Sequence, residues 1–362
     1  MTHPRTAERG PDDAFADDLL TGLVERHSPS GEEEPAVAYL VERMRDIGFH
    51  AQVDQAGNAV GEIGEGARTI LLLGHIDTVP GVIPVRREAN LLYGRGTVDA
   101  KGPLAAFAVA AARVGALPGK RLVVVGAVEE EAATSKGARF LLKRPGIGDP
   151  PPDAVVIGEP SSWRRVTVGY KGRLLARYVL SREVGHTAGP AQSVGEQAFA
   201  FWSRVTAHAD RWNADHDRMF DQLIPSLRNV NTEDDGFVET VCMVLGFRLP
   251  PEIDVDGLQE TLRDLAGGAR LHLYGREAAY RAPRSTSLAR AFVRAIHAQG
   301  ARATFQVKSG TSDMNVVGPV WGSPILAYGP GDALLDHTPR EHIDLTEYHR
   351  AITVLVHVLR DL

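Results

Sequence analysis

The stretch that decides the fold reads Leu71-Leu72-Leu73-Gly74-His75-Ile76-Asp77-Thr78-Val79-Pro80. Such an apolar run is typical of a strand buried on both faces, as in a sheet covered by helices. His75 and Asp77 lie at its carboxyl end, where α/β sheets bind ligands, and alternate residues there point the same way. We therefore predict that His75 is a metal ligand and that Asp77 holds its other ring nitrogen. A lone His-x-Asp pair is more often structural, so the prediction requires further candidate ligands elsewhere in the chain.

The length and composition are those of an ordinary globular protein with a large core. The 362 residues favour two domains, with 43% hydrophobic and 24% charged residues. The net charge of −6 and the lack of a Lys/Arg block give no signal for nucleic acid or a membrane surface. The one cysteine, Cys242, excludes an intramolecular disulfide and fits a reducing cytoplasm. Lying between Val241 and Met243, it is predicted to be a core thiol.

No segment is predicted to direct the chain to a membrane or out of the cell. Residues 1–13 are polar and lack the apolar region of a signal peptide. The Ala-rich stretch 102–117 is interrupted by Arg113 and is too short to span a bilayer, so a buried helix is expected there. We therefore expect a cytoplasmic protein.

Strand and helix patterns alternate through the first part of the chain. Ser30 and Glu33 form a predicted capping box for a helix. Solidly apolar strands recur, which predicts an α/β catalytic domain with a central, mostly parallel sheet. The predicted strands are 50–53, 58–63, 69–73, 91–94, 122–125 and 154–157.

The pattern changes near residue 169. Strands such as 174–180 and 238–249 alternate between apolar and polar residues, which predicts a half-exposed antiparallel sheet with helices on one face. A helix at 285–299 then returns the chain to the first domain. We predict a discontinuous catalytic domain, residues 1–168 and 283–362, with a smaller α+β lid and dimerisation domain at 169–282.

Acidic and histidine residues come after the strands of the first domain. Asp99 lies in the glycine-rich loop 94–102, where it could instead cap a helix. The triplet 129–131 comes after a buried strand, although acidic runs are usually solvated. Counted together, these candidate ligands are His75, Asp99, Glu131, Glu159 and His337.

Two histidines and three carboxylates suit two metal ions. If Asp99 bridges, each ion receives one histidine, one further carboxylate and a share of Asp99. This mixed nitrogen and oxygen ligation fits Zn²⁺ best and Co²⁺ next, and paired ions of this kind support hydrolysis. Glu130, beside a ligand, is predicted to be the general base, although the residues alone do not decide which glutamate of the triplet plays which part.

The motifs together resemble the M20 metallopeptidase family over nearly the whole chain. They are His75-x-Asp77, Gly96-Thr97-Val98-Asp99-x-Lys101-Gly102, Glu129-Glu130-Glu131 with Gly137, Gly158-Glu159-Pro160 and His337-Thr338-Pro339-x-Glu341. The resemblance implies a catalytic α/β domain with an inserted lid, the five metal ligands above with Asp99 bridging, and Glu130 as the base. Glu129 departs from the aspartate usual in the family.

The resemblance extends to two weaker motifs. Residues 185–190 are similar to the lid segment whose histidine, here His186, reaches the active site of the dimer partner and polarises the scissile carbonyl. The alternative is an ordinary loop histidine. Ser309, Gly310 and Thr311 resemble the loop that holds a substrate carboxylate, although the same residues could form a capped turn that opens a helix. A homodimer formed through the lid is implied.

The substrate prediction also comes from the resemblance, which is strongest to the lysine-biosynthesis branch. Those enzymes release lysine, or ornithine in arginine biosynthesis, from the γ-carboxyl of the C-terminal glutamate of a small acidic amino-group carrier protein. Arg164, Arg165, Lys171 and Arg173 could form a rim for that carrier or could be ordinary solvated surface. The alternatives are an acetylornithine or acetyl-lysine deacetylase, a dipeptidase, and a binding relative with a decayed site. Against decay, all five ligands and Glu130 are present.

Overall fold

The computed structural model describes residues 10–185 and 192–362. These residues divide into two compact units. The larger unit runs to Gly169 and takes up the chain again over Ala282–Gln306 and Ser312–Leu362. The smaller unit comprises Tyr170–Arg281 and Val307–Thr311. The functional division into catalytic and lid domains stays a prediction.

A mixed sheet with a parallel centre forms the middle of the larger unit. Its strand β3 pairs in parallel with β6 and β7, and β7 pairs in parallel with β15. The central strands are buried on both faces, as their solidly apolar sequences predict. In spatial order the strands are β1 (His50–Val53), β2 (Ala59–Ile63), β6 (Lys120–Ala127), β3 (Arg68–His75), β7 (Ala154–Gly158), β15 (Ile325–Ala327) and β8 (Arg165–Tyr170), with β14 (Thr304–Lys308) beside β8.

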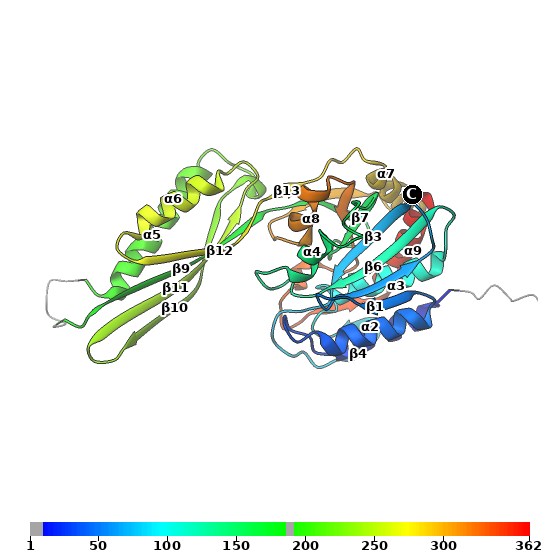
Figure 1. The fold of residues 1–362 in the computed structure, drawn as a ribbon, viewed down its shortest axis with the longest axis horizontal. Helices are drawn as coiled ribbons and strands as arrows, with labels where there is room; N and C mark the ends of the chain where they lie inside the picture. Colours follow the sequence, from blue (N-terminus) through cyan, green and yellow to red (C-terminus); the bar gives the residue numbers. More distant parts are fainter. Residues whose placement is uncertain (1–9, 186–191) are drawn as a thin grey trace, which may run out of the picture. The chain divides into compact units, whose positions relative to one another are not determined.

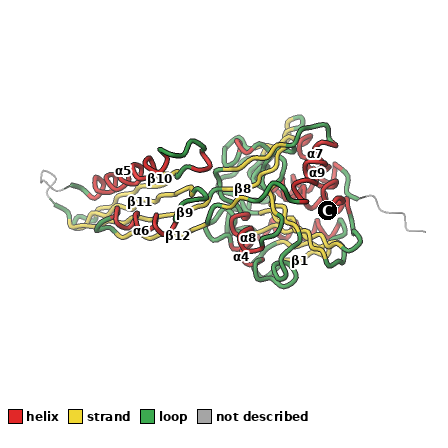
Figure 2. The backbone as a smooth tube through the Cα atoms, turned by 90° about the horizontal axis from the view of Figure 1, so that it is seen from above, coloured by secondary structure: helices red, strands yellow, loops and turns green. Residues whose placement is uncertain are grey.

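Helices cover both faces of this sheet. Figure 2 shows α7 and α9 on one side of the strands and α4 with α8 on the other. The helices of this unit are α1 (Asp13–Glu25), α2 (Glu34–Asp46), α3 (Lys101–Val114), α4 (Lys136–Leu141), α7 (Ser287–Ala298), α8 (Asp313–Trp321) and α9 (Leu345–Asp361). The predicted α/β class with a mostly parallel central sheet is therefore confirmed.

The Ala-rich stretch forms α3, which lies between the sheet and α9. Every residue from Lys101 to Ala111 is buried. Because other elements cover every face of this helix, it has no polar face. Among the residues that the structure describes, no helix combines the length and the apolar composition needed to cross a bilayer.

A small antiparallel sheet lies beside this core. It holds β4 (Arg86–Glu88), β5 (Leu91–Tyr93) and β16 (His342–Asp344), with β16 against β5. The pairing His342↔Tyr93 brings the segment after residue 336 next to the glycine-rich loop that begins after β5. This small sheet therefore brings together two segments that carry predicted ligands.

The smaller unit is an antiparallel sheet with two helices on one face (Figure 1). One face of the sheet packs on α5 and α6, and the other is exposed, as the alternating sequence predicts. Its elements are β9 (Gly172–Glu183), α5 (Val194–Asn213), β10 (Ile224–Asp234), β11 (Val238–Leu249), α6 (Val255–Ala266) and β12 (Arg270–Glu277), and then the short strand β13 (Tyr280–Arg281).

Two local predictions are wrong. Cys242 is not a core thiol: it is half-buried and accepts a hydrogen bond from Arg177, because alternation along β11 turns it away from its buried neighbours. The capping box of Ser30 and Glu33 does not form either. Helix α2 begins at Glu34 without a side-chain cap, and the Ser30 hydroxyl instead donates to Asp77 (2.7 Å).

Candidate metal centre

Three parallel strands end side by side and bring their polar residues to one edge of the sheet. In the register of the sheet, Gly74 of β3 lies opposite Gly126 of β6 and Gly158 of β7. His75 ends β3, the acidic triplet begins two residues after β6, and Glu159 comes directly after β7. The carboxyl ends of adjacent parallel strands thus place these groups at a common crevice.

The side chain of Asp99 lies between the two histidines. Its Oδ1 is 3.2 Å from Nε2 of His75, and its Oδ2 is 2.9 Å from Nε2 of His337. The same His337 nitrogen is 2.9 Å from Oε1 of Glu131. Asp99 does not cap α3, whose N-cap residue Ala100 makes no side-chain cap, so the alternative role is excluded. This arrangement is the one that a bridging carboxylate requires.

The donor atoms are close enough for metal coordination. One atom each from His75, Asp99 and Glu131 lies within 4.8 Å of the others. His75 is buried, whereas His337 lies outside this group of three and its side chain is 50% exposed, although its Nε2 is 2.9 Å from both Asp99 and Glu131. Glu159 is not in this group of three, but it is buried at the end of β7 and its charge acts on Glu130.

The site concentrates negative charge that the imidazoles offset. Burial disfavours a charge on Glu130, and Glu159, Asp313 and Glu131 add repulsion, so the pKa of Glu130 is raised well above its usual value. Hydrogen bonds to Asp99 and Glu131 raise the pKa of His337 to about 10. Carboxylates packed in this way call for compensating cations, and divalent metal ions at the same atoms would supply them.

Asp77 contacts both His75 and the loop that carries the glutamates, but its contact with His75 differs from the prediction. Nδ1 of His75 lies closer to the Asp77 carbonyl oxygen (3.0 Å) than to its carboxylate (3.5 Å). The carboxylate instead accepts hydrogen bonds from the amides of Glu130 (3.1 Å) and Glu131 (3.0 Å) and from the Ser30 hydroxyl. Asp77 therefore links the first histidine to the loop that carries the glutamates.

Glu341 has a structural role that the sequence motifs alone do not assign to it. Its fully buried carboxylate accepts hydrogen bonds from the amides of Gly96 (2.9 Å), Val98 (2.9 Å) and Asp99 (3.2 Å). Arg95 donates to its other oxygen (2.8 Å). Glu341 lies four residues after His337, so it joins the loop of one candidate ligand to that of another. The signal in the sequence is an acidic residue four positions after His337.

Two residues at the site adopt left-handed backbone conformations. His337 has φ of +60° and Glu129 has φ of +58°. Residues other than glycine seldom occupy this region, and those that do cluster at functional sites, where the surrounding contacts hold them. The left-handed turn at His337 lies within the same segment that Glu341 fixes to the Asp99 loop.

The predicted substrate-binding loop belongs to the smaller unit. The Thr311 hydroxyl donates to the Lys171 carbonyl (3.0 Å) and accepts from Arg248 (3.0 Å), and Gly310 has open space around it. The next residue, Ser312, caps α8, as the alternative interpretation expects. A substrate role for Ser309, Gly310 and Thr311 stays a prediction. His186 lies outside the described residues.

The residues of the predicted basic rim differ in their exposure to solvent. Lys171 is fully buried and its ammonium donates to the carbonyls of Met219 (2.8 Å) and Gln222, so its assignment to an exposed rim is wrong. Its hydrocarbon chain and two backbone acceptors make it part of the core of the smaller unit. Arg164 and Arg165, in the larger unit, are exposed.

Comparisons with known proteins identify the family. The model of peptidase family M20/M25/M40 matches residues 71–361. A LysW-lysine hydrolase from Deinococcus radiodurans is 45% identical over 357 residues, which cover 96% of this chain and 97% of that protein. A LysW-lysine/LysW-ornithine hydrolase from Sulfurisphaera tokodaii is 28% identical over 348 residues, covering 95% of each.

A solved structure supports the same fold. The M20 family metallo-carboxypeptidase Sso-CP2 from Sulfolobus solfataricus aligns with a TM-score of 0.78 at 18% identity, covering 95% of this chain and 98% of that one. The match to the family model and the 45% identity to the Deinococcus radiodurans enzyme confirm the family predicted from the sequence motifs. The chain belongs to peptidase family M20/M25/M40, and it is a metal-dependent hydrolase.

Proposed function

We propose that this hydrolase releases lysine from the carrier protein LysW by cleaving the amide to the γ-carboxyl of the carrier's C-terminal glutamate. Ornithine is the second amine that we consider. The similarity to the Deinococcus radiodurans enzyme along 96% of the chain supports this substrate. The observation that carries the hydrolytic mechanism is the Asp99 carboxylate placed between the imidazoles of His75 and His337.

The donor set fits two divalent ions. We assign His75, Asp99 and Glu159 to one ion and Asp99, Glu131 and His337 to the other. Mixed nitrogen and oxygen donors suit Zn²⁺ first and Co²⁺ second. When bound, the ions supply Lewis acidity and lower the pKa of water, the usual contribution of paired metals to amide hydrolysis.

Glu130 is the proposed general base. Its amide is held by Asp77, so its side chain is presented from a fixed backbone position. Burial keeps the pKa of the carboxyl high, which suits a group that takes a proton from water and then gives it to the leaving amine. Because Glu130 receives that proton and releases it within one turnover, it ends each cycle in its starting state.

The remaining roles complete the proposal. His186 supplies a donor to the developing oxyanion, where electrostatic stabilisation is often the largest catalytic contribution. Ser309, Gly310 and Thr311 bind a substrate carboxylate. The protein acts as a homodimer formed through the smaller unit, in the cytoplasm, at the release step of lysine biosynthesis or, with ornithine, of arginine biosynthesis.

The test is lysine release from LysW that carries γ-linked lysine, measured with Zn²⁺ or Co²⁺ and compared with acetyl-lysine and acetylornithine. Metal-dependent release from the carrier, at a kcat/KM far above that for the acetylated amino acids, is the expected result. Preference for acetylated amino acids would retain the mechanism and replace the substrate. If the metal-loaded protein hydrolyses none of them, the site is a decayed binding site.

A further inference from the structure

The connection between α1 and α2, residues 26–33, contains no proposed metal ligand but contacts three loops that carry proposed ligands. Its Ser28 and Glu33 are buried. A polar side chain that is buried needs a hydrogen-bond partner, and the partners of this connection lie on those three loops. The sequence of the α1–α2 connection is Arg26-His27-Ser28-Pro29-Ser30-Gly31-Glu32-Glu33.

The α1–α2 connection lies along the segment that follows β3. The amide of Thr78 donates to the Ser28 carbonyl (2.9 Å), and the Ser28 hydroxyl donates to the Ile76 carbonyl (2.8 Å). Between these two contacts, the Ser30 hydroxyl donates to Oδ2 of Asp77 (2.7 Å). The three residues that follow the first proposed ligand are therefore all held by this one connection.

The same connection contacts the two other loops. The buried Glu33 carboxylate accepts a hydrogen bond (3.1 Å) from the amide of Glu129, the first residue of the acidic triplet. From the glycine-rich loop, the Lys101 ammonium donates to the carbonyls of Leu23 (3.0 Å) and Arg26 (2.7 Å) at the end of α1. Lys101 lies two residues after the proposed bridging ligand. The α1–α2 connection thus joins three loops that are far apart in the sequence.

We propose that the α1–α2 connection positions the metal ligands, and that Ser30 is the positioning residue through which it acts on them. The inference rests on the proposed metal assignment, because it concerns how those ligands are held. The Asp77 carboxylate accepts the amides of Glu130 (3.1 Å) and Glu131 (3.0 Å), and it lies 3.5 Å from the His75 ring. Ser30 gives this carboxylate a shorter hydrogen bond than either amide does.

The orientation of Asp77 affects proposed ligands of both ions. Its contact with His75 concerns the ligand assigned to one ion, and its contact with the Glu131 amide concerns the ligand assigned to the other. Asp77 is fully buried, so loss of the Ser30 hydroxyl leaves a buried negative charge with one donor fewer. A carboxylate that has lost a donor is free to turn, and the two ligands then lose part of their support.

The Zn²⁺ affinity of Ser30→Ala, measured by competition with a chelator, tests the positioning role without catalysis. Contacts behind metal ligands typically contribute about 10- to 100-fold to metal affinity, and we expect the Kd of both ions to rise by about tenfold. Ser30→Thr retains the hydroxyl and should retain the wild-type Kd. Urea unfolding of the metal-free protein should be nearly the same for wild type and both variants. An unchanged Kd in Ser30→Ala, or a loss that Ser30→Thr shares, would overturn the proposal.

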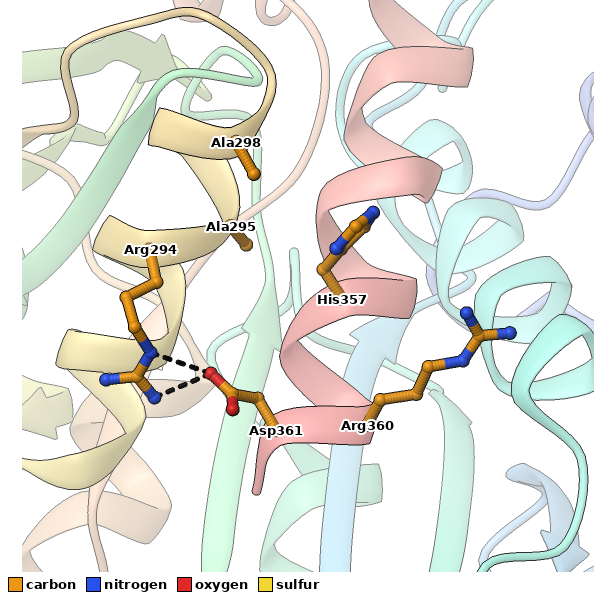
Figure 3. Close-up of a pocket in the computed structure, with 6 residues that line it drawn as sticks. All are labelled: Arg294, Ala295, Ala298, His357, Arg360 and Asp361. Atoms are coloured by element: carbon orange, nitrogen blue, oxygen red, sulfur yellow. Dashed lines mark hydrogen bonds and ion pairs between the residues drawn. The ribbon is translucent and has the colours of Figure 1, made fainter.

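Two contacts elsewhere in the larger unit provide matched controls. Ser323→Ala removes a hydroxyl that donates to the Pro152 carbonyl (2.6 Å) at the amino end of β7, whereas the metal centre lies at its carboxyl end. Arg294→Ala removes a donor to a carboxylate: Arg294 of α7 donates twice to Asp361 of α9 (2.8 and 2.6 Å), beside a hollow that no proposed ligand lines (Figure 3). We expect the wild-type Zn²⁺ Kd in both controls. A tenfold loss in either control would refute a specific role for Ser30.

A double-mutant cycle then tests whether Ser30 acts through Asp77. In an Asp77→Ala background, Ser30→Ala should no longer change the Zn²⁺ Kd, because the carboxylate that it orients is absent. Effects of the two substitutions that multiply would show independent action and would refute the proposed route.

His75→Ala separates this proposal from the metal assignment on which it rests. An unchanged Zn²⁺ stoichiometry in His75→Ala would refute that assignment and, with it, the positioning role. A lower stoichiometry in His75→Ala together with an unchanged Kd in Ser30→Ala would refute the positioning role alone. Because no measurement of Kd involves LysW, the result holds whichever substrate the enzyme hydrolyses.

Discussion

Neighbouring residues of the acidic triplet have different surroundings. Glu130 is buried among other carboxylates, Glu131 contacts His337, and Glu129 turns away to Thr134 and Lys136. The left-handed backbone at Glu129 accompanies this divergence. The family register predicts the same division, with Glu130 as base and Glu131 as ligand, and the departure at Glu129 falls on the residue that points away from the cluster.

Replacing the proposed base tests this division. Glu130→Gln keeps the shape of the side chain and removes its ability to take a proton, so kcat should fall by about 10²- to 10⁴-fold. The bound metal, measured by elemental analysis, should remain at the wild-type level because Glu130 is not a proposed ligand. Glu129→Gln is the matched control and should retain nearly full activity. A Glu130→Gln enzyme with wild-type kcat would remove this residue from the mechanism.

Glu341 should control how tightly metal is held. The Glu341 carboxylate accepts hydrogen bonds from three backbone amides of the Asp99 loop. Glu341→Gln removes its negative charge and should therefore weaken the link between the Asp99 loop and the His337 loop. Residues that position ligands in this way typically contribute about 10- to 100-fold to metal affinity, and we expect a loss of that size by competition with a chelator.

The control for Glu341→Gln is Asp54→Asn. Asp54 also accepts backbone amides, from Ala56 and Asn58, and pairs with Arg144, but its turn carries no proposed ligand. Wild-type metal affinity in both variants would show that Glu341 supports only the fold.

At the scale of elements, Lys171 fastens the 3-10 turn η1 (Met219–Asp221) to the start of the sheet of the smaller unit. Its ammonium donates to the carbonyls of Met219 and Gln222 on either side of that turn. The turn lies in the connection between α5 and the edge strand β10, so Lys171 ties that connection to the start of β9. A buried cation with backbone acceptors is the kind of contact that sequence motifs do not predict.

Lys171→Met should lower the free energy of unfolding by about 1–3 kcal/mol at pH 7, because two part-buried carbonyls lose their donor. Burial lowers the pKa of Lys171 to about 8 in the folded protein. The unfolded chain then binds more protons than the folded one between that pH and about 10.4, so this lysine makes stability rise with pH there. Urea unfolding should therefore show the gap between wild type and variant widening from pH 8 to 10. A pH-independent gap would contradict the buried, low-pKa assignment.

At the scale of the whole molecule, the metal ions should stabilise the fold as well as serve catalysis. The candidate ligands come from segments as distant in sequence as His75 and His337, and ions that bind only the folded arrangement stabilise it by mass action. At free Zn²⁺ of about 100 times its Kd, this contribution is about 3 kcal/mol. Removal with a chelator should abolish activity and lower Tm by several degrees, and added Zn²⁺ should restore both. An unchanged Tm would mean that the ions are not held between these segments.

The order of residues along the chain was enough to predict the family, the layered α/β core and the chemical groups of the site. Solidly apolar runs form strands covered on both faces, and the polar residues just beyond such runs emerge at the strand ends. Local composition also predicted the burial of α3, because an Ala-rich helix without a polar face needs cover on every side. These features depend on the residue types of short, continuous segments, and for that reason they can be predicted from the sequence.

How the groups cooperate depended on tertiary packing instead. Ser30 has the spacing of a helix cap, yet it donates to Asp77, 47 residues away. Glu341 accepts hydrogen bonds from backbone amides about 240 residues earlier in the chain. Lys171 donates to a turn about 50 residues later, and the residues next to Lys171 in the sequence do not predict that contact. Each is a polar side chain that needs a partner once it is buried, and which partner it meets depends on the packing of distant segments. Period and spacing predict where a side chain points, while packing decides what it touches.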